Sequence, residues 1–110
     1  MHLFDLKGKM ALVTGATGGI GAAIARALHH QGAIVAISGR NTAKLEELAA
    51  ELKDRVHIVP ADLSSPAAAD ELVKAAEAAM GQIDILVNNA GLTRDNLSMR
   101  MKDDEWTYSH

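Results

Sequence analysis

The sequence predicts an α/β domain in which a parallel β-sheet carries helices on both faces. Short apolar runs with the length of buried strands alternate along the chain with longer segments whose apolar residues recur at helical spacing. A glycine-rich turn joins the first apolar run to the first helical segment, which is typical of a sharp strand-to-helix connection in such a sheet.

The composition limits the classes of function. The 110 residues suffice for one domain with one modest core, with 48% hydrophobic residues, 23% charged residues and a formal net charge of -3. Because no basic stripe is present, we expect no nucleic-acid partner. No apolar run approaches the roughly 18 residues of a membrane span, and the first residues lack the apolar core of a signal peptide, so we expect no membrane association and a cytoplasmic location. Without cysteine there is no disulfide or thiolate nucleophile.

The first strand is expected over Met10–Val13, a continuous apolar run suited to a central parallel strand buried on both faces. After the turn, apolar residues recur at helical spacing as far as His30, and Gly32 ends this helix. His29 and His30 are adjacent, and adjacent helical residues point about 100° apart. We therefore expect no metal site from this pair, and none elsewhere in the chain.

The later elements continue the alternation. Ser65 followed by Pro66 is a helix start, because serine caps a helix and proline suits its first position. We expect strands at Ile34–Ile37, Val56–Val59 and Ile83–Asn88, helices at Thr42–Leu52 and from Pro66 to Met80, a loop over Leu92–Lys102, and the start of a further helix over residues 103–110.

Strands that alternate with helices imply right-handed crossovers in a parallel sheet. With the strand order 3-2-1-4, the first two crossovers step in one direction and the third steps back past the first strand. The third helix therefore lies on the opposite face of the sheet. The crevice between the carboxyl ends of strands 1 and 4 is where such a sheet binds a dinucleotide.

The candidate phosphate-binding turn is Thr14–Gly21, which reads Thr-Gly-Ala-Thr-Gly-Gly-Ile-Gly. Its glycines allow a ligand to approach the main chain, and the helix that follows presents free N–H groups and its positive dipole end to an anion. The spacing Gly-x-x-x-Gly-x-Gly differs from the common dinucleotide fingerprint Gly-x-Gly-x-x-Gly, so a glycine turn without a ligand is the alternative. The residues expected at the cofactor are Gly15, Thr17, Gly18, Gly19, Ile20 and Gly21, with the N–H groups from Thr17 to Ile20 on the pyrophosphate.

A second motif, Asn88-Asn89-Ala90-Gly91, directly follows the apolar run that ends at Val87. Together with the glycine turn and with Asp62 after the third apolar run, it resembles the short-chain dehydrogenase/reductase family. Within that family, residues 91–97, 99–102 and 105–106 look most like the 3-oxoacyl-acyl-carrier-protein reductases of fatty-acid synthesis. The resemblance reaches Trp106 but covers only the N-terminal half of such an enzyme. We therefore expect residues 1–110 to be a single, incomplete Rossmann-type domain that binds NADP.

The resemblance also assigns roles to five residues near the strand ends. It implies that Asp62 and the backbone of Leu63 hold the adenine edge. The alternative for Asp62 is that it is only a turn residue at the end of the strand. It implies that Ala90 and Gly91 line the path to the nicotinamide ribose. For Asn88, a backbone contact across the central strands and a direct cofactor contact are equally open.

The choice of cofactor depends on the end of the second strand, Ser38-Gly39-Arg40. Many dinucleotide folds have an acidic residue there that accepts hydrogen bonds from the ribose hydroxyls. An acid would repel a 2′-phosphate, whereas Arg40 can bind one with a planar, charge-assisted fork. We therefore expect NADP rather than NAD. The family's NADP-dependent reductases often have a second basic residue where this chain has Gly18.

The resemblance implies a catalytic tyrosine, a lysine four residues later that lowers the pKa of that tyrosine, a serine that orients the carbonyl and an asparagine on the proton path. Tyr108 is followed by Ser109 and His110, so the 110 residues contain no Tyr-x-x-x-Lys and no matching serine or asparagine. We expect no catalytic residue here and no activity from this chain alone. The alternatives are a nucleotide-binding fragment without catalysis and a related reductase of another ketone.

The expected partners also come from the resemblance. An intact reductase of this kind takes a small-molecule or carrier-protein-linked acyl substrate and forms a homotetramer. We expect this chain to lack that tetramer, because the helices that build it follow the fourth strand. We also expect the apolar edge of the fourth strand to lie open and to favour association.

Overall fold

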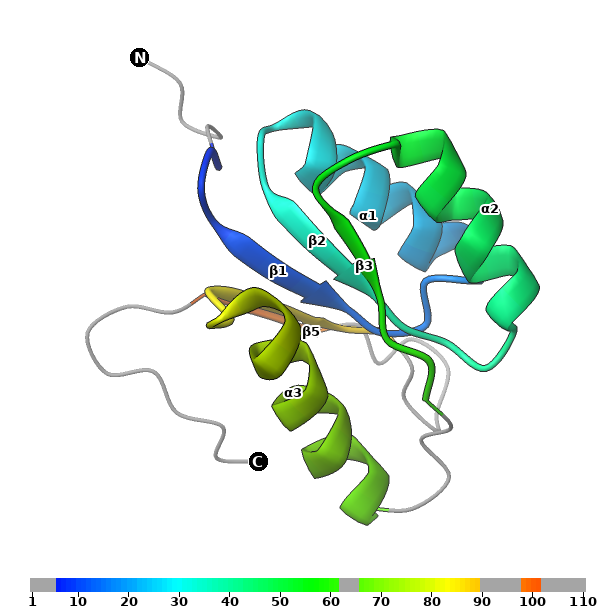
Figure 1. The fold of residues 1–110 in the computed structure, drawn as a ribbon, viewed down its shortest axis with the longest axis vertical. Coiled ribbons are helices and arrows are strands. Elements are labelled where there is room, and N and C mark those ends of the chain that lie inside the picture. Colours follow the sequence, from blue (N-terminus) through cyan, green and yellow to red (C-terminus); the bar gives the residue numbers. More distant parts are fainter. Residues whose placement is uncertain (1–5, 62–65, 90–97, 102–110) are drawn as a thin grey trace.

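The structure, a computed structural model, describes residues 6–61, 66–89 and 98–101 (Figure 1). The strands are β1 (Met10–Val13), β2 (Ile34–Ile37), β3 (Val56–Ile58), β4 (Ile85–Asn88) and β5 (Ser98–Met101), and the helices are α1 (Gly19–His30), α2 (Thr42–Leu52) and α3 (Pro66–Met80).

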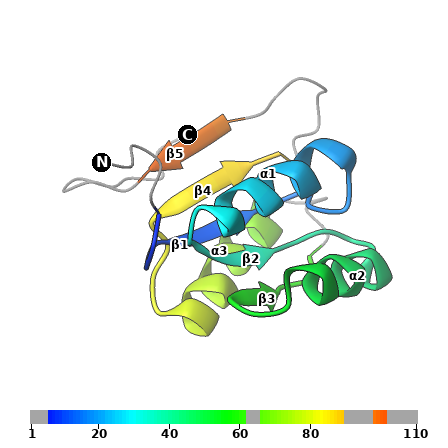
Figure 2. The same cartoon turned by 90° about the horizontal axis from the view of Figure 1, so that it is seen from above.

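The strands form one sheet in the order β3-β2-β1-β4-β5. The first four strands are parallel, and Leu12 at the centre of β1 is paired with Ala36 of β2 and Leu86 of β4. The predicted order 3-2-1-4 and the Rossmann-type architecture are confirmed. Seen from above, the sheet runs from β5 to β3 with α1 and α2 on one side and α3 on the other (Figure 2).

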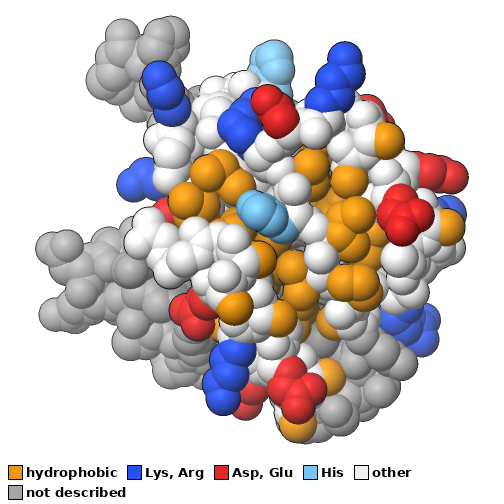
Figure 3. All heavy atoms as spheres, viewed as in Figure 1, with side chains coloured by type: hydrophobic (Ala, Val, Ile, Leu, Met, Phe, Trp, Pro, Cys, Tyr) orange, Lys and Arg blue, Asp and Glu red, His pale blue; other side chains and the backbone are white. Residues whose placement is uncertain are grey.

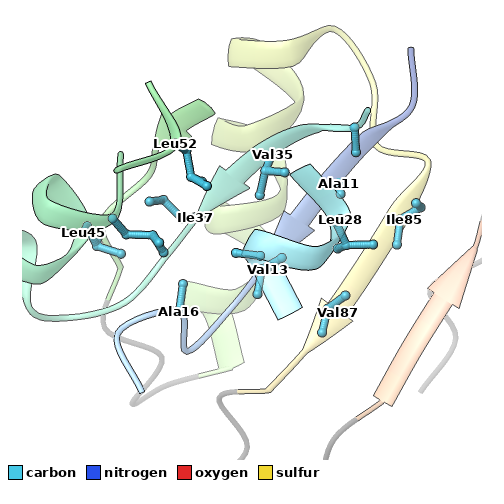
Figure 4. Close-up of a cluster of buried hydrophobic side chains, with 13 residues drawn as sticks. Ala11, Val13, Ala16, Leu28, Val35, Ile37, Leu45, Leu52, Ile85 and Val87 are labelled. Carbon is cyan, nitrogen blue, oxygen red and sulfur yellow. The ribbon is translucent and has the colours of Figure 1, made fainter. Parts of the chain in front are cut away.

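Alternate residues of the strands fill two separate cores. On the side of α1 and α2, Val13, Ile37 and Val87 pack with helix residues that include Leu28 and Leu45 (Figure 4). On the opposite face, Leu12 and Ala36 pack with Leu72, Ala76 and Met80 of α3. Because β1 and β2 are buried on both sides, their sequences are continuously apolar. The third helix lies on the opposite face, as predicted.

The expected loop over Leu92–Lys102 is wrong for Ser98–Met101, which form β5 antiparallel to β4. The edge of β4 is therefore covered, and the expectation of an open apolar edge there is also wrong. Ser-Met-Arg-Met lacks the β-branched and aromatic residues that favour strands, so this strand depends on pairing with β4 rather than on local propensity. Two strand ends differ as well, since β3 ends at Ile58 and β4 begins at Ile85.

The opposite edge of the sheet is β3, whose three residues are all partly exposed. In the view of Figure 1, β3 lies in front between α2 and α3. Apolar side chains gather at the centre of this face around a histidine, and charged side chains surround them (Figure 3). The helix expected over residues 103–110 lies outside the described residues.

The described residues contain neither a membrane-spanning helix nor a cluster of metal ligands. None of the helices there has the length and apolar character that a membrane span requires. In the same part of the chain, no three His, Asp or Glu side chains are grouped to hold a metal ion. The His29 ring instead donates a hydrogen bond from Nε2 to the carbonyl oxygen of Asp54 at 2.6 Å.

Candidate cofactor site

The candidate site lies at the carboxyl ends of β1, β2 and β4, which meet at one edge of the sheet. The glycine-rich turn leaves β1, Arg40 follows β2, and Asn88 is the last residue of β4. The fold therefore brings together the predicted residues that it describes. Four predicted residues lie outside the described part of the chain: Asp62, Leu63, Ala90 and Gly91.

Two glycines give the turn its shape. Gly15 has a φ of +65°, in the left-handed region that favours glycine, and its carbonyl oxygen accepts a hydrogen bond from the N–H of Gly18 at 3.2 Å. Gly21, in the first turn of α1, is buried against the same carbonyl, and a Cβ atom there would overlap the Gly15 oxygen. The start of α1 thus packs directly on the turn that leaves β1.

The N-terminus of α1 has the features of an anion site. Its cap residue is Gly18, which has no side chain to accept the first N–H groups, and its first turn contains no acidic residue. The N–H groups of Gly19, Ile20 and Gly21 precede the first intrahelical bonds and add to the positive end of the dipole. The Ile20 side chain is 65% exposed beside them. An anionic group can therefore bind here through the backbone.

Two residues that sequence reasoning did not select hold the turn against β4. The Thr14 hydroxyl donates to the carbonyl oxygen of Val87 at 3.3 Å and accepts from the N–H of Asn89 at 2.8 Å. The Asn89 side chain donates from Nδ2 to the Gly15 carbonyl at 3.3 Å. Thr14 and Asn89 stand inside the two motifs that predicted the site, but the motifs alone did not indicate that these residues touch. The two motifs therefore form one hydrogen-bonded unit.

Asn88 has one contact that bears on its role. Its Oδ1 lies 3.4 Å from the Thr14 hydroxyl, in competition with the Val87 carbonyl for the same hydrogen. The residue itself is exposed at the end of β4. The contact fits a structural role and the exposure fits a cofactor contact, so both interpretations of Asn88 remain.

The end of β2 forms the other half of the site. Gly39 and Arg40, with Pro60 and Ala61 after β3, line an open hollow of about 350 Å³. Arg40 is exposed, and no carboxylate among the described residues pairs with it. The N–H of Ala16 donates to the carbonyl of Ser38 at 2.9 Å, which joins the glycine turn to this strand end. Arg40 is thus a cation beside this hollow, near the candidate anion site at the N-terminus of α1. Such a cation is suited to bind a second phosphate.

Comparison with known proteins identifies the family. Residues 9–109 match the family model described as short chain dehydrogenase. The chain belongs to the short chain dehydrogenase family. It is 57% identical over 104 residues to nodulation protein G of Rhizobium sp. (strain N33), a match that covers 94% of this chain and 42% of that relative. Membership of this oxidoreductase family, which was predicted, is confirmed.

Solved structures of related short chain dehydrogenases share the fold. The Pseudomonas aeruginosa RhlG/NADP active-site complex is 42% identical, with a TM-score of 0.74, over 84% of this chain and 39% of that one. The 3-ketoacyl-(acyl-carrier-protein) reductase of Brucella melitensis complexed with NADH is also 42% identical, with a TM-score of 0.68, over 74% of this chain and 33% of that one. The chain therefore spans less than half the length of these relatives. A nicotinamide cofactor is the ligand class of its family.

Proposed function

We propose that this chain is the cofactor-binding part of an NADPH-dependent 3-oxoacyl-acyl-carrier-protein reductase. The pyrophosphate of the cofactor lies on the N–H groups of the segment from Thr17 to Ile20, of which that of Gly18 also donates to the Gly15 carbonyl. The 2′-phosphate lies on Arg40. Asp62 and Leu63 hold the adenine edge, while Ala90 and Gly91 line the path to the nicotinamide ribose.

The observation that carries the cofactor proposal is the position of Arg40. It stands beside the hollow at the end of β2, and both residues before it, Ser38 and Gly39, lack a carboxylate. In dinucleotide sheets this strand end meets the adenosine ribose. A guanidinium there forms charge-assisted hydrogen bonds with a 2′-phosphate, and no neighbouring acid in the segment opposes it.

The substrate proposal rests on the sequence resemblance and on the Brucella melitensis reductase. Bound NADPH would supply a hydride to the carbonyl carbon of a 3-oxoacyl thioester, and the carbonyl oxygen would take up a proton to give a 3-hydroxyacyl product. The described residues bind and orient the cofactor for this transfer. The proposal assigns the proton to a tyrosine of the intact reductase, and these 110 residues contain no Tyr-x-x-x-Lys.

The test is Arg40→Asp, followed by fluorescence titration with NADPH and NADH. Loss of a charge-assisted bond is worth about 1.5–3 kcal/mol, so we expect NADPH binding to weaken roughly 10- to 100-fold. NADH binding should change little, since NADH has no phosphate at this position. Equal losses of affinity for both cofactors would contradict the assignment of Arg40 to the 2′-phosphate.

Lys74→Asp is the matched control. Lys74 is exposed on α3, on the opposite side of the sheet from α1, and the substitution makes the same change in net charge. It should leave both titrations unchanged. If it weakened NADPH binding as much as Arg40→Asp does, the weaker binding of Arg40→Asp would be explained by the change in net charge and not by a lost phosphate contact.

A further inference from the structure

Thr17 of the glycine-rich turn lies against Gly39 at the end of β2. A Cβ atom on residue 39 would stand 2.9 Å from the methyl carbon of Thr17 and 3.3 Å from its hydroxyl oxygen. Non-bonded carbon atoms pack at about 3.5–4.0 Å. The methyl of Thr17 therefore occupies the space that any side chain at position 39 needs.

The backbone on both sides of this contact is held by hydrogen bonds. The carbonyl of Ser38, just before Gly39, accepts from the N–H of Ala16, just before Thr17, at 2.9 Å. The carbonyl of Gly39 accepts from the N–H of Ala61 at 3.2 Å. Moving either segment away would disturb these bonds, so a side chain at position 39 must be accommodated by Thr17 itself.

Threonine is poorly suited to make that adjustment. It is branched at Cβ, so its methyl and hydroxyl fill two of the three staggered positions and restrict its rotation. Both groups face position 39 within 3.3 Å. A serine at position 17 keeps the hydroxyl, lacks the methyl, and has a free position into which the hydroxyl can turn.

We propose that Thr17 is a specificity-determining residue of the cofactor site, because its methyl keeps position 39 free of a carboxylate. An acid at this strand end would bind the ribose hydroxyls of an unphosphorylated dinucleotide and repel a 2′-phosphate. The preference for NADPH then depends on the pair Thr17 and Gly39 as well as on Arg40. This inference rests on the proposed function.

The test compares Gly39→Asp with Gly39→Asp/Thr17→Ser, using titration with NADPH and NADH. The Gly39→Asp variant should lose NADPH binding, and its affinity for NADH should rise little. The reason is that the aspartate displaces Thr17 and, together with Thr17, the glycine-rich turn. The double variant should bind NADH roughly tenfold more tightly than Gly39→Asp, a usual size of coupling between touching residues. Equal NADH affinities for the two variants would overturn the role of Thr17.

An uncharged pair tests the packing without any cofactor. Gly39→Ala should lower the melting temperature in the parent and much less in the Thr17→Ser background. Equal losses in both backgrounds would overturn the inference. All variants are also made in an extended protein, in which residue 110 is followed by the C-terminal part of a relative's sequence. The test can then be read even if the short chain folds poorly. A parent that binds neither cofactor in either form would instead overturn the proposed function.

Discussion

The carboxylate of Asp84 accepts a hydrogen bond from the backbone N–H of Met10 at 2.9 Å, and the N–H of Asp84 donates to the Met10 carbonyl at 2.7 Å. These two residues stand at the beginnings of neighbouring parallel strands, since Met10 opens β1 and Asp84 precedes β4. The hydrogen bonds of this pair join β1 and β4 at the end of the sheet opposite to the candidate cofactor site. Gln82 adds a hydrogen bond of 3.1 Å from its side-chain amide to the same carboxylate.

Asp84→Ala should destabilise the chain without touching the cofactor site. It leaves the N–H of Met10 without its side-chain acceptor, and a lost hydrogen bond to a charged group costs about 1.5–3 kcal/mol. Urea unfolding measures the loss. Asp84→Asn, which keeps an acceptor oxygen, should lose less, and Asp70→Ala on the exposed face of α3 is the matched control. An Asp84→Ala variant as stable as the control would show that the pair contributes nothing.

Local sequence was enough to predict most of the sheet. Met10–Val13 and Ile34–Ile37 are strands as predicted, because both are continuous apolar runs between turn residues. The helix at Thr42–Leu52 also has the predicted bounds, and the Asn41 side chain caps it by accepting from the N–H of Lys44 at 3.1 Å. Each of these elements depends on signals within its own segment.

The parts that were missed depend on residues far apart in the sequence. β5 exists because Ser98–Met101 meets the backbone of β4, and nothing in the composition of this segment predicts that pairing. In the site, the spacing of glycines predicted the turn but not the contact of Thr14 with Asn89 or of Thr17 with Gly39. Such contacts are set by the packing of the whole sheet, which no single motif encodes.

The ion pair between Arg26 and Glu51 should give the chain a small, pH-dependent stabilisation. Arg26 of α1 donates from Nε to Glu51 of α2 at 2.6 Å and from a second nitrogen at 3.1 Å. The hydrogen bond from Arg26, together with its charge, holds the pKa of Glu51 below the ordinary glutamate value, against a smaller opposing effect of desolvation. Both side chains are about half exposed, so the effect on stability is small.

The sign of the pH dependence follows from the lowered pKa. A carboxylate whose pKa is lower in the folded state stabilises that state fully above its unfolded pKa, about 4.3 for glutamate. This stabilisation is lost as the pH falls through the folded-state pKa. Glu51→Gln should therefore melt slightly below the parent at neutral pH, and the two should converge in acid. Glu47→Gln, exposed on the same helix, is the control. A difference that persists or grows in acid would contradict the assignment.

The 110-residue chain should show no measurable reduction of an acetoacetyl thioester by NADPH. Hydride transfer to a ketone leaves an oxyanion that must be protonated, and general acid catalysis is typically worth about 100- to 10,000-fold. The chain has the proposed site for the nicotinamide cofactor, but its 110 residues contain no Tyr-x-x-x-Lys to supply and tune that acid. An extended protein that continues into a relative's Tyr-x-x-x-Lys segment should be active. The measurement is the loss of NADPH absorbance by both proteins side by side.

Replacing the tyrosine of that segment by phenylalanine in the extended protein is the control, and it should abolish turnover while leaving NADPH titration unchanged. This combination separates the acid from the cofactor site, because a variant that had lost its fold would lose both signals. If the short chain turned over at a rate near that of the extended protein, the acid would have to come from within the 110 residues. Tyr108→Phe would then be the first substitution to make, since Tyr108 is the only tyrosine in the sequence.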